Sequence, residues 1–220
     1  MNRKLYHGSD RIVEKPMSNV GNIHNDYGLG FYCTTIERLA KEWGSRKNGV
    51  GYVNRYVLRD DRFKILDLTK PPFGSVLYWV ALLMHNRELS NETRTKYLRE
   101  LGYLEKQYLI DVKEYDVVIG YRADDSYFQF PEAFVRSEIT FDSLQKIFAA
   151  GDLGKQYVLI SQRAFNNIHF KGYFAVDEES RKDYYSRKNS ADKIFTDLLE
   201  QDRYSKGKRL RDLVMNDEDK

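Results

Sequence analysis

The chain has 220 residues, of which 41% are hydrophobic and 31% charged, as expected for one globular domain or a domain with an appendage. Its 36 Lys and Arg residues nearly balance its 33 Asp and Glu residues, so a net charge of +3 does not by itself indicate a nucleic-acid-binding protein. The single cysteine, Cys33, excludes an internal disulfide and a cysteine-ligated zinc site, and a cytoplasmic protein is expected. The sequence starts without an apolar signal core, and its longest apolar run, residues 76–84, is too short to cross a membrane.

Strand-like and helix-like segments follow one another along the chain. Alternating apolar residues and β-branched or aromatic runs predict strands, whereas apolar residues three and four apart predict helices. The predicted strands are residues 4–7, 12–13, 27–33, 49–58, 63–68, 115–120, 156–161 and 168–176, with 49–58 and 63–68 joined as a hairpin. The predicted helices are residues 35–44, 75–86, 89–112 and 128–148, the last interrupted near Pro131 and Ser137.

The composition changes at residue 177. Residues 177–220 are mostly charged but keep one apolar set at helical spacing, which predicts a charged helical tail that packs on the domain or is held for a partner. We therefore predict a domain over residues 1–176, with a largely helical insertion at 75–148, followed by this tail. Because helices are inserted between strands that are expected to pair as hairpins, the fold class is α+β rather than a doubly wound sheet.

Several positions have both a structural and a functional interpretation. His7 is either a buried structural histidine or, with the bare backbone of Gly8 beside it, part of a site that holds a planar amide. Tyr32 and Trp43 are either core aromatics or a stacking slot for a planar ring. Gln156 is either a solvated amide at the start of a strand or a group that orients a ribose or a nucleophile.

Residue spacing excludes other kinds of site. The four histidines lie far apart, with no HxxxH or HExxH pair, so no metal site is predicted. Gly28-x-Gly30 lacks the third glycine and the following acid of a dinucleotide-binding fingerprint. Asp124 and Asp125 are adjacent, so an extended backbone points them to opposite sides, as in a solvated turn.

Three segments together resemble the motifs of the ADP-ribosyltransferase fold, in its PARP-like or diphtheria-toxin-like branch. Residues 5–9 (LYHGS) resemble the first motif, residues 28–32 (GLGFY) the second and residues 156–161 (QYVLIS) the third. The second stacking aromatic of PARPs lies eleven residues after the tyrosine, which here is Trp43. The three motifs occur in the family's order and cover about a third of the chain. The whole chain also resembles an uncharacterised bacterial family of PARP-like proteins, through its YHGS, DYGLGFY, DVVIG and QYV segments.

This resemblance implies a split antiparallel β-core with inserted helices that binds NAD as a substrate. Carried over by position, His7 would hydrogen-bond the adenosine-side ribose, and the Gly8 backbone would clamp the nicotinamide carboxamide. Tyr32 and Trp43 would border the nicotinamide ring. The remaining residues of the implied NAD-binding set are Ser9, Gly30 and Phe31.

The third motif departs from the family pattern. Gln156 stands in the place of the catalytic glutamate, whose charge stabilises the oxocarbenium-like transition state at the nicotinamide ribose. A glutamine can hydrogen-bond the ribose 2′-hydroxyl but brings no charge, a loss of ~100-fold or more in rate. The resemblance thus implies transfer of a single ADP-ribose unit, with His7, Tyr32 and Gln156 as the catalytic set. Asp124 or Asp125 is the predicted source of the missing carboxylate.

Two other functions fit the same motifs. One is a non-catalytic module that binds NAD or ADP-ribose, and the other is an NAD glycohydrolase. The expected partners are NAD and a protein or nucleic-acid acceptor. Genes of this type often accompany small antitoxin genes, so an antitoxin is a further expected partner and the protein would be the toxin of a toxin–antitoxin or phage-conflict system. Neither a metal nor a membrane is an expected partner.

Overall fold

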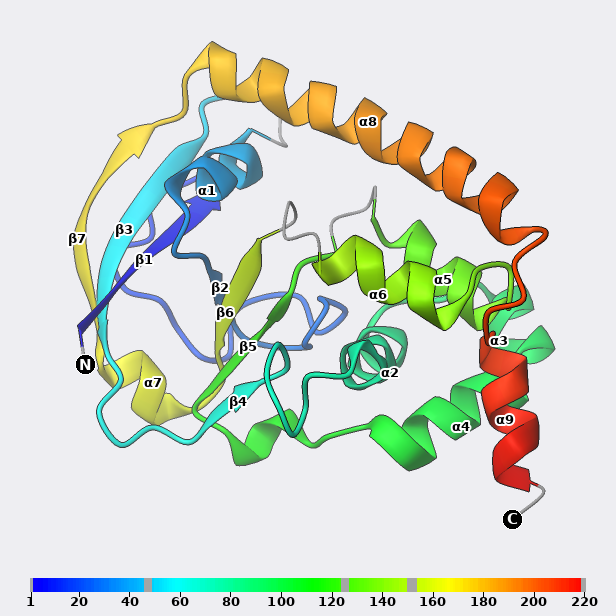
Figure 1. The fold of residues 1–220 in the computed structure, drawn as a ribbon. Coiled ribbons are helices and arrows are strands. Elements are labelled where there is room, and N and C mark those ends of the chain that lie inside the picture. The colour runs from blue at the N-terminus through cyan, green and yellow to red at the C-terminus, as the bar shows by residue number, and fades with distance from the viewer. Residues whose placement is uncertain (1, 46–48, 124–126, 150–153, 219–220) are drawn as a thin grey trace.

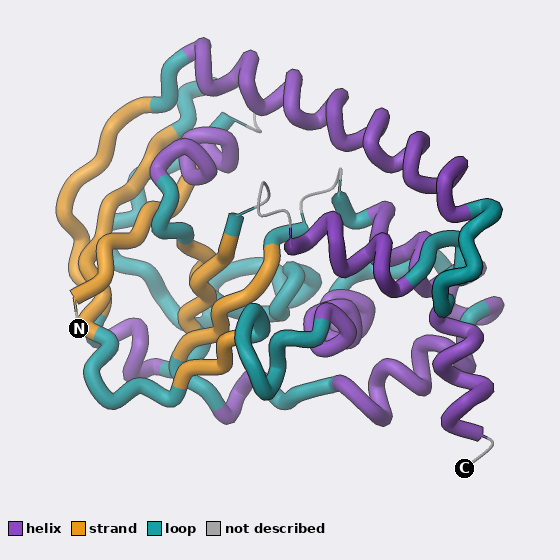
Figure 2. Tube along the Cα trace, viewed as in Figure 1, coloured by secondary structure: helices purple, strands orange, loops and turns teal. Residues whose placement is uncertain are grey.

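The strands and most of the helices occupy different sides of the molecule (Figure 1). The computed structural model describes residues 2–45, 49–123, 127–149 and 154–218. Most of the helices lie on the side opposite the strands, and the long helix α8 (Glu178–Asp202) extends from the strand side to the helical side (Figures 1 and 2). This mixed architecture confirms the predicted α+β class.

The strands of the described residues form two sheets. In the first, β1 (Asn2–Ser9), β3 (Tyr52–Arg59) and β7 (Ile168–Ala175) pair antiparallel in the order β1-β3-β7. In the second, β2 (Phe31–Cys33), β6 (Lys155–Leu159), β5 (Val117–Tyr121) and β4 (Ile65–Asp67) follow one another in that order. An antiparallel bridge between Tyr6 and Thr34, with N–H···O distances of 2.8 and 2.9 Å, joins β1 to the end of β2. The two sheets are therefore held together next to His7.

The predicted hairpin of residues 49–58 and 63–68 is wrong. β3 pairs with β1 and β7, whereas β4 pairs in parallel with β5 in the other sheet, so the strand pairing is antiparallel except at this edge. Asp116 accounts for the difference, because its carboxylate accepts hydrogen bonds from the Lys64 N–H at 2.9 Å and from the Ser161 hydroxyl at 2.5 Å. These two bonds tie the start of β4 to the segment that follows β6.

Other predicted boundaries of strands and helices also differ from those observed. Only the end of the predicted strand 27–33 is a strand, because Gly28 has a φ of +74° that interrupts the extended backbone. Residues 12–13 form no strand, since the Val13 N–H donates to the side chain of Asn54 at 2.8 Å. The predicted interruption near Ser137 is confirmed, since Ser137 has a φ of +57° and lies between the helices Gln129–Val135 and Phe141–Ala149. The predicted interruption near Pro131 is wrong, because Pro131 lies within the first of these helices. The helices other than α8 are α1 (Glu37–Gly44), α2 (Val76–Asn86), α3 (Asn91–Lys96), α4 (Leu98–Tyr108), the 3₁₀ turn η1 (Val112–Glu114), α5 (Gln129–Val135), α6 (Phe141–Ala149), α7 (Gln162–Asn166) and α9 (Leu210–Glu218).

Two hydrophobic clusters form the core. The smaller cluster takes side chains from both sheets, among them Leu5, Tyr56 and Leu159, so the sheets pack against each other. The larger cluster surrounds α2, whose residues from Val76 to Met84 are nearly all buried. Helices α8 and α9 contribute Ala191, Leu210 and Val214 to this larger cluster, so the tail packs on the rest of the chain.

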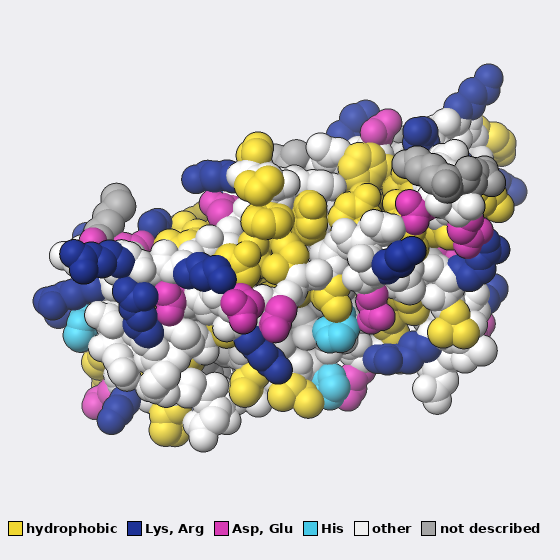
Figure 3. Space-filling view, turned by 90° about the horizontal axis from the view of Figure 1, so that it is seen from below, with side chains coloured by type: hydrophobic (Ala, Val, Ile, Leu, Met, Phe, Trp, Pro, Cys, Tyr) yellow, Lys and Arg dark blue, Asp and Glu magenta, His cyan; other side chains and the backbone are white. Residues whose placement is uncertain are grey.

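The surface is mixed in charge. Seen from below, apolar side chains gather between acidic and basic ones (Figure 3), so this face carries no large field of one sign, in keeping with the near-balanced charge. Among the described residues, no helix combines the length and the apolar character that crossing a bilayer requires.

Candidate functional site

A cavity of about 560 Å³ lies where β1, β2, β6 and the loop after β1 meet. This volume is in the range of small-molecule and cofactor sites, roughly 300–1,000 Å³. The cavity brings together segments that are as much as 149 positions apart, since both His7 and Gln156 line it. All the predicted site residues line it, although their chemical roles stay predictions: His7, Gly8, Ser9, Gly30, Phe31, Tyr32, Trp43 and Gln156.

The ring of His7 has a defined tautomer. Its Nδ1 lies 2.7 Å from the backbone carbonyl oxygen of Tyr32. A carbonyl oxygen only accepts, so Nδ1 carries the proton and donates it, which leaves Nε2 of the neutral ring as an acceptor. Burial lowers the pKa of His7 and thereby favours this neutral form, and the hydrogen bond to Tyr32 opposes the shift. The ring also packs against Phe31, with centroids 4.4 Å apart.

The two motif glycines allow close approach of neighbouring elements. A Cβ on Gly8 would lie 1.9 Å from the backbone oxygen of Ala40 in α1, and one on Gly30 would lie 2.6 Å from Val158 in β6. Both positions therefore require glycine for packing, whatever ligand the cavity takes. The nearby Ser9 hydroxyl donates to the Arg11 carbonyl, so it is engaged within its own loop.

Tyr32 offers its ring rather than its hydroxyl. The hydroxyl donates to the Gly28 carbonyl at 2.6 Å and accepts from the Tyr27 N–H at 3.0 Å, which braces the loop before β2. Burial raises the pKa of Tyr32 well above its ordinary value, and the nearby carboxylate of Asp26 adds to that shift. The phenol is therefore a poor proton donor or acceptor for chemistry, and the ring face is what remains for a ligand.

Trp43 forms part of the cavity wall together with a buried arginine. The guanidinium of Arg122 lies 5.3 Å from the centre of the Trp43 ring, a cation–π contact. Arg122 is only 1% exposed and pairs with the buried carboxylate of Glu42 at 3.3 Å. Glu42 lies on α1 next to Trp43, so the indole and the guanidinium are positioned by the same helix.

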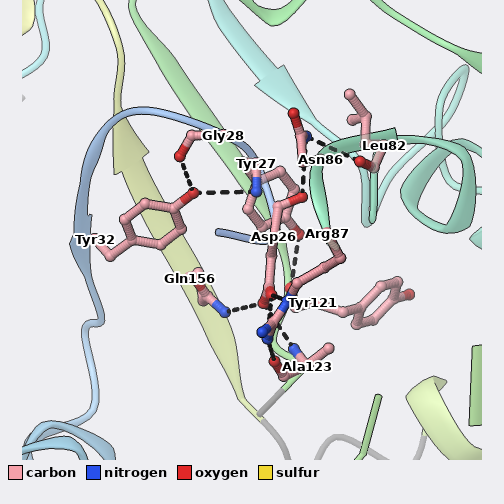
Figure 4. Close-up of polar contacts among 10 residues, drawn as sticks. All are labelled: Asp26, Tyr27, Gly28, Tyr32, Leu82, Asn86, Arg87, Tyr121, Ala123 and Gln156. Carbon is pink, nitrogen blue, oxygen red and sulfur yellow. Dashed lines mark hydrogen bonds and ion pairs between the residues drawn. The ribbon is translucent and has the colours of Figure 1, made fainter. Parts of the chain in front are cut away.

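Gln156 is held by a carboxylate that the sequence motifs do not include (Figure 4). Its Nε2 donates to Oδ2 of Asp26 at 3.0 Å, and the Ala123 N–H donates to the same oxygen at 3.0 Å. The other oxygen, Oδ1, accepts a hydrogen bond from Nε of Arg87 at 2.9 Å and forms an ion pair with Nη2 of the same residue at 2.8 Å. Burial raises the pKa of Asp26, while Arg87, the Ala123 N–H and Gln156 each favour the charged form.

The loop after β1 is fixed by Asn54, a buried residue of β3 that the sequence analysis did not select. Its Nδ2 donates to the Arg11 carbonyl and to the Ser9 hydroxyl, each at 3.1 Å, and its Oδ1 accepts from the Val13 N–H. A polar residue on the strand face that otherwise carries Tyr52, Tyr56 and Leu58 is the one sequence signal for this role.

The two aspartates predicted to supply a carboxylate lie outside the described residues. Asp124 and Asp125, the predicted sources of a carboxylate, fall in the gap between the described residues 123 and 127. Within the described part of the chain, no group of three or more His, Cys, Asp or Glu residues is arranged to hold a metal. The carboxylate that does contact Gln156, Asp26, stands two positions before the Gly28-x-Gly30 motif.

The chain was compared with known protein families and structures. A family model described as "Protein of unknown function (DUF3990)" matches residues 3–170, a range that includes every cavity residue named above. No curated protein and no solved structure matches the sequence.

Proposed function

The chain belongs to the DUF3990 family, and we propose that it is an NAD-dependent mono-ADP-ribosyltransferase. One observation carries the proposal: the three segments that resemble the NAD-binding motifs come from distant parts of the chain and line one cavity. The division of the strands into two sheets, joined at Tyr6 and Thr34, supports the proposal because the resemblance implies a split core. A chance similarity of three short motifs gives no reason for them to converge in space.

The lining of the cavity suits a dinucleotide. Four basic residues line it against three acidic ones, an excess that favours a pyrophosphate. The aromatic ring of Tyr32 provides an apolar face for a planar base, and the unprotonated Nε2 of His7 accepts from a ribose hydroxyl. The basic residues are Arg11, Lys15, Arg87 and Arg122, and the acidic ones Asp10, Glu14 and Asp26.

The proposed reaction replaces nicotinamide by an acceptor. The bond between the ribose C1′ and the nicotinamide nitrogen breaks, and its electron pair leaves with neutral nicotinamide. Positive charge develops at C1′ and the ring oxygen, and the amide oxygen of Gln156 accepts a hydrogen bond from the ribose 2′-hydroxyl to stabilise it. A hydroxyl or amine of the acceptor then forms a bond to C1′ and releases its proton to solvent. Water in place of the acceptor gives the NAD glycohydrolase reaction.

The test is transfer of label from NAD. We expect that the protein, incubated with NAD labelled in its adenylate phosphate and a bacterial lysate, releases nicotinamide and labels a macromolecule. His7→Ala should lower both products ~100-fold, because it removes a ribose ligand. His169→Ala is the matched control, since His169 is exposed on β7 and should leave the activity unchanged.

Two substitutions of Tyr32 distinguish a stacking role of its ring from a structural role of its hydroxyl in the same assay. Tyr32→Ala removes the ring and should abolish labelling, whereas Tyr32→Phe keeps the ring and loses only the hydroxyl that braces Gly28. Tyr32→Phe should therefore lower the melting temperature and retain most of the activity. Tight NAD binding without nicotinamide release would instead indicate the non-catalytic module, and free ADP-ribose without labelled macromolecule would indicate a glycohydrolase. The acceptor, protein or nucleic acid, and the antitoxin partner of a toxin stay predictions.

A further inference from the structure

We propose that Asp26 supplies, through the amide of Gln156, the negative charge that the third motif lacks. This inference rests on the proposed function. The direct contact is the 3.0 Å hydrogen bond from Gln156 Nε2 to Asp26 Oδ2, in a place where both residues are 4% exposed (Figure 4). Asp26 is a positioning residue: it acts on the ribose only through the amide.

The hydrogen-bond partners of Asp26 favour its charged form, against the burial that raises its pKa. Its two oxygens accept hydrogen bonds from Arg87 Nε, from the Ala123 N–H and from Gln156, and Oδ1 also forms an ion pair with Arg87 Nη2. Each of these partners is an N–H donor, and a protonated carboxyl would place its own proton against one of them. The hydrogen bond and the ion pair described for Arg87 both go to Oδ1, whereas Gln156 donates to the other carboxylate oxygen, Oδ2.

This contact also fixes the orientation of the amide. The nitrogen and the oxygen of an amide lie on opposite sides of one carbon, so an Nε2 that donates to Asp26 turns Oε1 away from it. Both residues line the cavity, and no donor to Oε1 is recorded among the described residues. A carboxylate behind the N–H increases the electron density on the amide oxygen, which makes that oxygen a stronger acceptor for a hydroxyl.

Several elements hold Asp26 in place. Its backbone oxygen accepts from the Asn86 side chain at 3.3 Å, and Arg87 follows Asn86 at the end of α2. The next residue, Tyr27, donates its N–H to the Tyr32 hydroxyl and its own hydroxyl to the Tyr121 carbonyl at 2.6 Å. The position of Asp26 is thus set by α2, β2 and β5 together.

A charge exchange between positions 26 and 156 tests the inference. Asp26→Asn removes the charge and should lower kcat for nicotinamide release ~10–100-fold with little change in the KM for NAD. Gln156→Glu places two carboxylates about 3 Å apart and should also lower kcat. The double variant D26N/Q156E restores one carboxylate and one amide in reversed order, and its kcat should return to within ~10-fold of wild type.

A purely structural role for Asp26 predicts a different result. In that case the two effects add, and the double variant is worse than either single variant, which overturns the inference. Asp202→Asn is the matched control, because Asp202 is also 4% exposed and its carboxylate also accepts a hydrogen bond from a backbone N–H, that of Thr140. This control should lower the melting temperature without changing kcat.

The remaining outcomes separate the inference from the proposed function. A wild-type protein that cleaves NAD, with a D26N variant of equal kcat, overturns the role of Asp26 alone. A wild-type protein that neither binds nor cleaves NAD overturns the proposed function and this inference with it. If D26N does not fold, the comparison of Q156E with D26N/Q156E decides, since recovery in the double variant supports the inference and a further loss contradicts it.

Discussion

At the scale of single residues, one backbone hydrogen bond determines what His7 can do. The carbonyl of Tyr32 fixes the proton on Nδ1, and burial keeps the ring neutral by lowering its pKa. In this state Nε2 accepts a hydrogen bond, whereas a protonated ring has no acceptor. The proposed role of His7 in binding a ribose and the stability of the fold therefore depend on the same proton.

The stability of the protein should fall on acidification because of His7. The unfolded chain has an ordinary histidine pKa of 6.5, while the folded protein has a lower one, so between these two values the unfolded state binds the additional proton. The free energy of unfolding should decrease as the pH falls below about 6.5 and level off below the folded pKa. Chemical denaturation at a series of pH values measures this, and His7→Gln should flatten that part of the curve. A His7→Gln variant with the same slope as wild type would show that other groups cause the pH dependence. His169→Gln, on the exposed edge of β7, is the control.

At the scale of elements, the sequence predicted those helices and strands that depend on residues close together in the chain. The helical spacing around α1 and α2 and the alternation in β3 agree with the structure, because each depends on neighbours in the chain. The pairing of β4 depended on Asp116, fifty positions away, and a hairpin was wrongly predicted there. Asp26 was not selected for the same reason: in the sequence it is one acid in a loop, and only the fold places it against Gln156.

The second half of helix α8 should contribute to stability through Phe195. Phe195 packs edge-on against Phe130 of α5 at 5.0 Å, whereas its neighbour Ile194 is 45% exposed. Phe195→Ala should lower the free energy of unfolding by ~2 kcal/mol, because a half-buried aromatic side chain is lost from the larger core cluster. Ile194→Ala, at the preceding position, should change the free energy of unfolding by less than ~0.5 kcal/mol. Equal effects of the two substitutions in urea unfolding would mean that α8 does not pack through this face.

At the scale of the whole molecule, the carboxylate of Glu42 connects the cavity to the C-terminal part of the chain. It accepts from Arg38 one turn earlier in α1 at 2.7 Å and from Arg122, which follows β5, at 3.3 Å. It also pairs with Arg187 of α8. Because Arg122 lies over the ring of Trp43, the contact with α8 and the wall of the cavity share one anion.

Removing that anion should affect both stability and binding. Glu42 is 1% exposed, so Glu42→Gln removes a buried negative charge that pairs with both Arg122 and Arg187. We expect a loss of ~3 kcal/mol in the free energy of unfolding, together with weaker binding of NAD, the proposed substrate, in calorimetry as Arg122 moves from Trp43. Glu37→Gln, in the exposed first turn of the same helix, should cost less than ~1 kcal/mol and leave NAD binding unchanged. A Glu42→Gln variant that loses stability but binds NAD as tightly as wild type would show that the tail stabilises the fold without acting on the cavity.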